Sequence, residues 1–201
     1  NLAALPNTSA AEYLTNQGLE PGGAAPTAFL AQGNPENYLS TQGVRVQDQG
    51  SQLVALALLE VAHKSGRWLD MCAGPGGKAA MLQAGISPSG GVLDCLEPIP
   101  NRADLVRQAL NPKLQANVMV GYGQDAKAGF YDAVLLDAPC SGLGSVRRKP
   151  ESRWRKTTEQ LSGLTKTQSE LLAAAAKALK SGGYLLYSTC SPLVIETNTQ
   201  I

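Results

Sequence analysis

Two cysteines in this sequence each follow a run of strand-forming residues. Cys140 lies in "LLDAPCSGLG", residues 135–144, and Cys190 lies in "YLLYSTCSP", residues 184–192. A thiolate is a strong nucleophile, and a second thiol beside it can serve as an acid–base group. The carboxyl ends of strands in a parallel sheet share one edge, where such sheets bind their ligands. The pattern therefore predicts a two-thiol site at the edge of a sheet.

A glycine-rich stretch, "LDMCAGPGGK", stands between an expected strand and an expected helix. Its glycines allow the backbone to approach a ligand closely. Gly74-x-Gly76-x-x-Ala79 fits a dinucleotide-binding fingerprint, and Glu97 lies 21 residues beyond Gly76 at the end of the next strand. That spacing suits a carboxylate that accepts hydrogen bonds from ribose hydroxyls.

Acidic residues around this loop favour S-adenosylmethionine over NAD as the ligand. Asp70 ends the strand beside the loop, where its charge would oppose a pyrophosphate and favour an ammonium or a sulfonium. Asp125 and Asp137 add carboxylates at the ends of two further strands. We therefore expect a cationic cofactor.

A sulfonium beside two thiols indicates a particular covalent chemistry. A thiolate can add to carbon 6 of a cytosine ring, which makes carbon 5 nucleophilic enough to take a methyl group. A second acid–base group can then assist loss of the carbon 5 proton and release of the thiol. Asp137, which precedes Cys140 by three residues, could hydrogen-bond the ring and stabilise developing charge. We expect Cys95 to be a buried structural thiol and Cys72 to contact the cofactor through its backbone.

Three motifs in one chain, "MCAGPGGK", "DAPCSGLG" and "YSTCSP", closely resemble those of the Sun/Fmu-type (RsmB-like) RNA 5-cytosine methyltransferases, as in bacterial 16S ribosomal RNA methylation. The resemblance covers residues 44–201. It implies that Cys190 is the nucleophile and that Cys140 assists product release, whereas DNA 5-cytosine methyltransferases attack with the Pro-Cys thiol. The cofactor contacts that it implies are Cys72, Ala73, Gly74, Pro75, Gly76, Gly77, Lys78, Glu97, Asp125 and Asp137.

The sequence departs from the family pattern at its C-terminal end. Family members usually carry a pair of acidic residues soon after the Thr-Cys-Ser motif, and here only Glu196 is present. The family's sheet also continues with two further strands, so we expect these C-terminal strands to be missing from this chain. Residues 1–43 are expected to be the tail of an N-terminal RNA-binding extension, and residues 44–201 the catalytic domain.

The order of expected elements predicts the fold class. Expected strands alternate with helices, which indicates an α/β fold with a doubly wound, mostly parallel, Rossmann-like sheet of the class I methyltransferase type. An alanine-rich helix is expected to end at Gly182 and Gly183. The five expected strands are "RWLDMC", "GVLDCLEP", "ANVMVGY", "YDAVLLDAP" and "YLLYSTC".

The composition of the chain indicates which binding partners and which cellular compartment to expect. The 17 basic and 16 acidic residues nearly cancel, but six of the basic residues fall within positions 147–156, interleaved with an aromatic side chain. Such a segment suits looped or single-stranded RNA, with candidate contacts at Arg147, Arg148, Lys149, Arg153, Trp154 and Arg155. The absence of a Cys-x-x-Cys pair argues against a zinc site, so no metal is expected. No signal peptide or membrane span is visible, and we expect a cytoplasmic protein with reduced thiols.

Three rival interpretations remain open at the level of the sequence. The same chemistry could act on transfer RNA rather than ribosomal RNA. A chain with this C-terminus could also be a binding module that retains RNA and cofactor without turnover. An NAD-dependent dehydrogenase is the most distant rival, and the oligomeric state is not indicated by any pattern.

Overall fold

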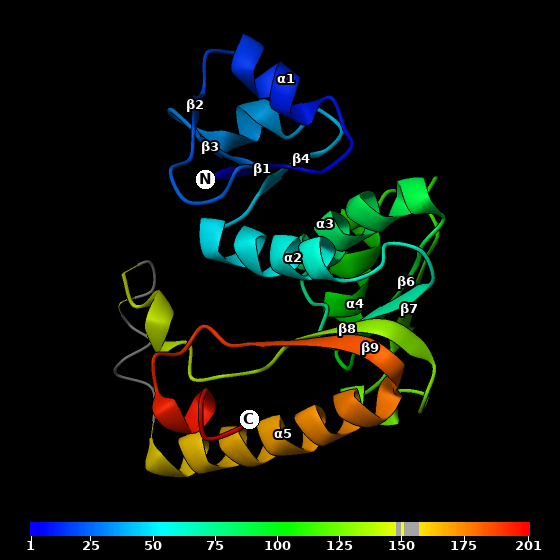
Figure 1. The fold of residues 1–201 in the computed structure, drawn as a ribbon. Helices are drawn as coiled ribbons and strands as arrows, with labels where there is room; N and C mark the ends of the chain where they lie inside the picture. The colour runs from blue at the N-terminus through cyan, green and yellow to red at the C-terminus, as the bar shows by residue number, and fades with distance from the viewer. Residues whose placement is uncertain (148–149, 151–156) are drawn as a thin grey trace.

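A five-stranded parallel sheet forms the centre of the computed structural model, which describes residues 1–147, 150 and 157–201 (Figure 1). The strands lie in the order β7-β6-β5-β8-β9 and pair in parallel throughout. This confirms the predicted α/β fold with a Rossmann-like sheet. The bounds are β5 Arg67–Asp70, β6 Val92–Glu97, β7 Ala116–Val120, β8 Tyr131–Asp137 and β9 Leu179–Ser188.

The order of the strands explains where a ligand can bind. The chain enters the sheet at β5, moves outward through β6 and β7, and returns to place β8 on the other side of β5. A crevice opens at the carboxyl ends where the strand order reverses, here between β5 and β8. Asp70 and Asp137 end these two strands, and Asp137 is paired in register with Ser188 at the end of β9.

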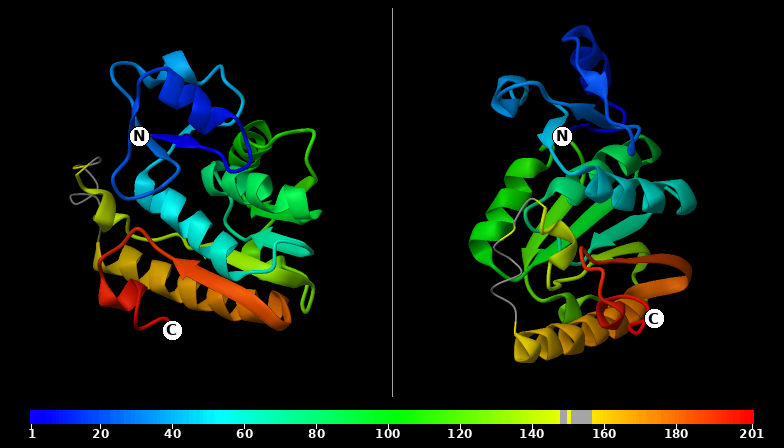
Figure 2. Two further views of the ribbon diagram at one scale, coloured as in Figure 1. Left: turned by 45° about the horizontal axis from the view of Figure 1, so that its top comes forward. Right: turned by 90° about the vertical axis from the view of Figure 1, so that its left-hand side faces the viewer.

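Helices cover both faces of the sheet (Figures 1 and 2). Helices α2, α3 and α4 lie on one face and α5 lies on the other. Side chains alternate between these faces along each strand, so Trp68 and Leu135 pack towards α2 and α3 while Leu69 and Leu136 pack towards α5. The bounds are α2 Gln49–Val61, α3 Gly77–Ile86, α4 Pro100–Ala109 and α5 Thr158–Ala178.

The end of α5 differs from the prediction. The helix ends at Ala178, and Gly182 and Gly183 lie inside β9 rather than capping the helix. The reason is tertiary: Leu179 already pairs with Tyr131 of β8, and the ladder resumes at Tyr184 after an irregularity. Lys180 makes an ion pair with Asp132 at 2.8 Å, which holds this extension against β8. Pairing with a neighbouring strand outweighs the helix propensity of this segment.

The N-terminal residues form a small antiparallel sheet in the order β2-β3-β1-β4, accompanied by α1. Its core contains Leu2, Leu14 and Phe29. The last strand ends at Val46, just beyond the boundary predicted at residue 43, and the chain then enters α2, where the Asp48 side chain accepts a hydrogen bond from the Gly50 amide. The bounds are β1 Leu2–Ala4, α1 Ala10–Asn16, β2 Glu20–Pro21, β3 Ala28–Leu30 and β4 Val44–Val46.

Within the described part of the chain, no helix is long and apolar enough to cross a membrane.

Candidate active site at the ends of strands β5, β8 and β9

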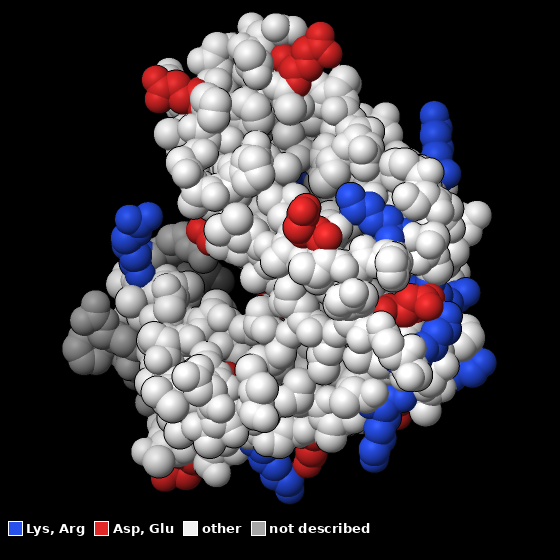
Figure 3. Space-filling model, in the orientation of Figure 1, with Lys and Arg blue, Asp and Glu red and all other residues white. Residues whose placement is uncertain are grey.

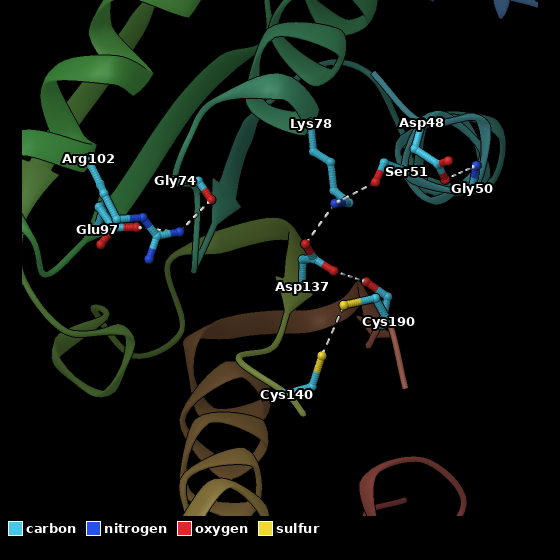
Figure 4. A network of polar contacts seen from close by, with 11 residues as sticks. Asp48, Gly50, Ser51, Gly74, Lys78, Glu97, Arg102, Asp137, Cys140 and Cys190 are labelled. Atoms are coloured by element: carbon cyan, nitrogen blue, oxygen red, sulfur yellow. Dashed lines mark hydrogen bonds and ion pairs between the residues drawn. The ribbon is translucent and has the colours of Figure 1, made fainter. Parts of the chain in front are cut away.

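The two cysteines meet at the edge of the sheet (Figure 4). Their sulfur atoms lie 3.3 Å apart, although the residues are 50 positions apart in the chain. Backbone hydrogen bonds fix the two loops together, from the Ala138 amide to the Ser188 carbonyl and from the Gly144 amide to the Cys190 carbonyl, each 2.9 Å long. Cys190 is exposed and Cys140 is half-buried. The structure thus brings together the two residues that the sequence proposed as a pair.

Sharing one hydrogen bond makes the two thiols chemically unequal. Either sulfur can be the donor in this geometry; with Cys140 donating, the hydrogen bond lowers the pKa of Cys190 to about 6 even though burial opposes ionisation. The same hydrogen bond, together with burial, raises the pKa of Cys140. In that arrangement Cys190 is the thiolate at neutral pH, and Cys140 is the neutral thiol that donates a hydrogen bond to it. A thiolate exposed to an open site is a competent nucleophile.

Asp137 lies between the thiols and the glycine-rich loop. One of its oxygens accepts from the Lys78 ammonium at 2.7 Å, and the other accepts from the Ser188 hydroxyl at 2.8 Å. Lys78 also lies 3.4 Å from the Ser51 hydroxyl at the start of α2 (Figure 4). Two strands and two helices therefore hold a charged pair beside Cys190.

A buried carboxylate, Glu196, ties the two cysteine loops to α5. Its oxygens accept from the Ser141 amide at 2.7 Å, the Ser141 hydroxyl at 2.5 Å and the Gln168 side chain at 3.0 Å. The Ser141 hydroxyl also lies 3.1 Å from the Ser191 hydroxyl, next to Cys190. In the sequence, Glu196 stood out only as a departure from the family pattern. Its distance along the chain from Ser141 and Gln168 does not predict these contacts.

Two positions of the glycine-rich loop, Gly74 and Gly76, have no room for a side chain. Gly76 has a φ of +104°, and a Cβ there would lie 2.6 Å from the Cβ of Ala109 on α4. A Cβ on Gly74 would collide with the Glu97 carboxylate. The loop is thereby packed against β6 and α4, and the first turn of α3 begins at Gly77. Amides at the start of a helix have no partners within the helix and suit an anionic group.

A pocket opens beside the loop and contains an unpaired carboxylate. Asp70 is 1% exposed, and neither of its oxygens has a hydrogen-bond partner within the described residues. Burial and the nearby Asp137 raise the pKa of Asp70 to about 7. A cation entering the pocket would pair with Asp70 and stabilise its ionised form. The pocket is lined by Val46, Gln47, Ser51, Asp70, Cys72, Ala73, Gly74, Pro75, Gly77, Lys78 and Asp137.

Two carboxylates proposed as cofactor contacts lie outside this lining. Glu97 is buried behind Gly74, where it accepts from the Ile99 amide at 3.0 Å and lies 3.6 Å from the Arg102 guanidinium. Arg102 in turn donates to the Gly74 carbonyl at 2.9 Å. Asp125 is exposed, in a short 3-10 turn after β7. The structure therefore places Glu97 next to the loop and Asp125 farther along the same edge.

The other two cysteines, Cys72 and Cys95, lie in surroundings that disfavour the thiolate form. Burial raises the pKa of Cys72 to about 12, and the nearby Asp70 adds to this shift. Burial also raises the pKa of Cys95 well above its ordinary value. Neither thiol is available as a thiolate at neutral pH. In the described ranges, no cluster of three or more His, Cys, Asp or Glu side chains is arranged to hold a metal ion.

The basic segment is described only at its start. Arg147 is exposed and follows the turn Leu143–Ser145, close in sequence to Cys140. The other proposed RNA contacts, Arg148, Lys149, Arg153, Trp154 and Arg155, lie outside the described residues. Figure 3 shows a hollow in the molecule near the start of α2, below the N-terminal sheet. The pocket residues Val46, Gln47 and Ser51 come from this region.

A family model described as 16S rRNA methyltransferase RsmB/F matches residues 56–201 of this chain. The chain belongs to this family. The match includes the glycine-rich loop and both cysteine motifs, whereas the pocket residues Val46, Gln47 and Ser51 precede it. This confirms the resemblance drawn from the three motifs.

Individual relatives agree with the family match. The Mycobacterium tuberculosis protein Rv1407 is 45% identical over 174 residues, which cover 84% of this chain and 38% of that protein. The ribosomal RNA small subunit methyltransferase B of Sodalis glossinidius is 37% identical over 163 residues, 79% of this chain and 37% of that enzyme. The chain therefore spans little more than a third of the length of these relatives.

A solved structure shows the same fold. The crystal structure of NSun6 from Pyrococcus horikoshii with SFG superposes with a TM-score of 0.67 at 25% sequence identity. The superposition covers 85% of this chain and 44% of that protein.

Proposed function

We propose that this chain transfers a methyl group from S-adenosylmethionine to carbon 5 of a cytosine in 16S ribosomal RNA, through a covalent bond between Cys190 and the base. The observation that carries this proposal is the pair of thiols whose sulfur atoms lie 3.3 Å apart; with Cys140 as the donor of their hydrogen bond, the pKa of Cys190 is lowered to about 6. Family membership and the methyltransferase B relatives support ribosomal RNA as the substrate. Such a substrate implies action in the cytoplasm.

The pocket beside the glycine-rich loop fits S-adenosylmethionine. Its unpaired, buried Asp70 carboxylate suits a cationic ligand, and its glycines leave room for close backbone contact. When bound, this cofactor supplies an electrophilic methyl group on a sulfonium. Residues Cys72 to Lys78 would surround it, and Glu97, behind Gly74, would face its ribose hydroxyls. The NSun6 structure with SFG, which shares the fold, supports S-adenosylmethionine as the cofactor.

In the first step, Cys190 acts as the nucleophile. Its thiolate attacks carbon 6 of the cytosine, a C–S bond forms, and the electrons of the C5–C6 double bond move onto the ring and make carbon 5 nucleophilic. Asp137 can accept a hydrogen bond from the ring, and the Lys78 ammonium, 2.7 Å from Asp137, offsets the negative charge brought by the thiolate. Carbon 5 would then take the methyl group as the S–CH3 bond of the sulfonium breaks, which would leave a neutral thioether as the second product.

The second step releases the product. A base removes the proton from carbon 5, the electrons of that C–H bond restore the C5–C6 double bond, and the C6–S bond breaks. The sulfur leaves as the Cys190 thiolate. Cys140 assists this departure because its thiol donates a hydrogen bond to the thiolate as it forms. The cytosine must leave its stack to reach these thiols, so a looped or flipped base is expected.

Methyl transfer from labelled cofactor tests the proposal. The chain is incubated with methyl-labelled S-adenosylmethionine and either 16S ribosomal RNA or transfer RNA, and the digested nucleosides are separated by mass spectrometry. The proposal predicts label in 5-methylcytidine from ribosomal RNA and none with the Cys190→Ala variant. Label in another nucleoside, or preferential labelling of transfer RNA, would contradict it. Binding of both ligands without any methyl transfer would favour a non-catalytic binding module.

A further inference from the structure

Gln47 carries an amide side chain that is buried without a partner. It lies between β4 and α2, is 8% exposed, and neither its Nε2 nor its Oε1 has a hydrogen-bond partner within the described residues. Its backbone is well held, because its amide donates to the Asn1 carbonyl at 3.2 Å and its carbonyl accepts from Gln52 at 3.0 Å. Burying an unpaired amide costs free energy, so a bound ligand is a natural partner for this side chain.

The amide faces the same pocket as Asp70. Both residues line the pocket beside the glycine-rich loop. A Cβ added to Gly77 would lie 3.5 Å from the Gln47 Cδ and 3.7 Å from both Nε2 and Oε1, which places the amide at the first turn of α3. The pocket thus combines a buried carboxylate, a buried unpaired amide and the amino end of a ten-residue helix.

These three features match the two charges of an α-amino acid. The Asp70 carboxylate suits the ammonium group, while the start of α3 and a Gln47 N–H donor suit the carboxylate. Lys78 is committed to Asp137 at 2.7 Å, so it is not needed for this role. Glu97, the proposed ribose partner, touches the opposite end of the loop at Gly74.

We propose that Gln47 binds the carboxylate of the methionine part of S-adenosylmethionine, and this inference rests on the proposed function. Gln47 immediately follows the N-terminal sheet, so that sheet contributes directly to the cofactor site through the Asn1–Gln47 hydrogen bond. The loop then separates two ends of the ligand, with the ribose near Gly74 and the amino-acid end near Gly77.

Calorimetric binding with three probes tests this assignment. The probes are S-adenosylmethionine, its decarboxylated analogue, and 5′-methylthioadenosine, which lacks the whole amino-acid portion. Gln47→Ala is expected to weaken the binding of S-adenosylmethionine about tenfold to a hundredfold, the range for loss of a hydrogen bond to a charged group. Both probes without a carboxylate should bind the variant and the wild type within about twofold. Gln42→Ala, an exposed glutamine outside this pocket, is the matched control and should bind all probes as the wild type does.

A second variant keeps the test decisive. Gln47→Glu places a negative charge opposite the ligand carboxylate, so it should weaken S-adenosylmethionine binding more than Gln47→Ala does while retaining the decarboxylated analogue. Equal losses for all three probes, or unchanged affinity for S-adenosylmethionine, would overturn the assignment. If the wild type binds 5′-methylthioadenosine and S-adenosylmethionine equally, the carboxylate makes no contact and the inference is wrong while cofactor binding stands. Failure of the wild type to bind any probe would overturn the proposed function and this inference with it.

Discussion

At the scale of single residues, the site depends on one hydrogen bond between two sulfur atoms. We assign Cys140 as its donor and Cys190 as its acceptor, which gives the two thiols opposite pKa shifts. The Lys78 ammonium also favours the Cys190 thiolate, whereas Asp137 opposes it. The hydrogen bond is the largest of these effects, so its removal should be visible in the reactivity of Cys190.

Alkylation by iodoacetamide as a function of pH measures this effect. In the wild type, modification of Cys190 should increase as the pH rises through about 6. In Cys140→Ala the donor is lost, so the midpoint should move upward toward the ordinary thiol value of 9.0. Peptide mass spectrometry identifies the modified residue, and Cys190→Ala gives the background from other thiols. An unchanged midpoint in Cys140→Ala would contradict the assigned hydrogen bond.

The sequence predicted some of these residues and missed others for a physical reason. Cys140 and Cys190 could be paired because each follows a strand, and strand ends of a parallel sheet converge. Glu196 and Gln47 could not be found this way, since neither is at a strand end of that sheet. Glu196 reaches Ser141 across 55 positions of the chain, a contact that only the folded loops create.

At the scale of elements, Glu196 joins three segments that approach from different directions. The Cys140 loop follows β8, the Cys190 loop follows β9, and Gln168 projects from α5. Gln168 also donates to the Pro139 carbonyl at 2.8 Å, and the Tyr187 hydroxyl donates to the Glu196 carbonyl at 2.8 Å. Burial raises the pKa of Glu196, but hydrogen bonds from Ser141, Ser191 and Gln168 outweigh burial and lower it.

Replacing Glu196 should therefore destabilise the fold in a pH-dependent way. Glu196→Gln removes a charged acceptor from buried donors, so the free energy of unfolding should fall by about 1–3 kcal/mol at neutral pH. Because the folded-state pKa of Glu196 is lowered, its stabilisation is present above the unfolded-state value of 4.5 and is lost as the pH falls below it. Urea unfolding at pH 7 and at lower pH checks both points.

Glu170→Gln, on an exposed position of α5, is the control for this experiment and should leave the stability within about 0.5 kcal/mol. A Glu196→Gln variant as stable as the control at pH 7 would show that the carboxylate does not hold the loops together.

Element boundaries were less predictable than element types. The strands and helices follow from alternating apolar segments and the glycine-rich loop. The start of β9 does not, because Leu179 joins the sheet through pairing with Tyr131 and the Lys180–Asp132 ion pair. Local propensity favours a longer helix there, and tertiary contacts decide the outcome. The N-terminal sheet was also missed, since its strands have only two or three residues each.

At the scale of the whole molecule, the proposed RNA binding requires local positive charge, because the net charge of the chain is only +1. We interpret residues 1–43 as part of an N-terminal module and the basic segment beginning at Arg147 as an RNA contact. Electrostatic contacts with phosphates release counterions and make binding depend on salt.

Salt titration of RNA binding tests the role of Arg147. If this side chain contacts one phosphate of a looped RNA, Arg147→Ala should reduce the slope of log K against log salt by about 0.7. Fluorescence anisotropy with a labelled ribosomal RNA fragment measures the slope. Lys113→Ala, on the loop between α4 and β7, is the comparison, and an equal change in both variants would refute a specific contact at Arg147.

Cys190 is proposed to attack the base, and Cys140 is proposed to assist its release. A denaturing gel of the chain incubated with S-adenosylmethionine and 16S ribosomal RNA tests this directly, with the wild type, Cys140→Ala and Cys190→Ala run side by side. Cys140→Ala should accumulate a covalent protein–RNA adduct, because the leaving thiolate loses its hydrogen-bond donor, and Cys190→Ala should form none. An adduct that accumulates in Cys190→Ala and is absent from Cys140→Ala would reverse the two roles and contradict the account.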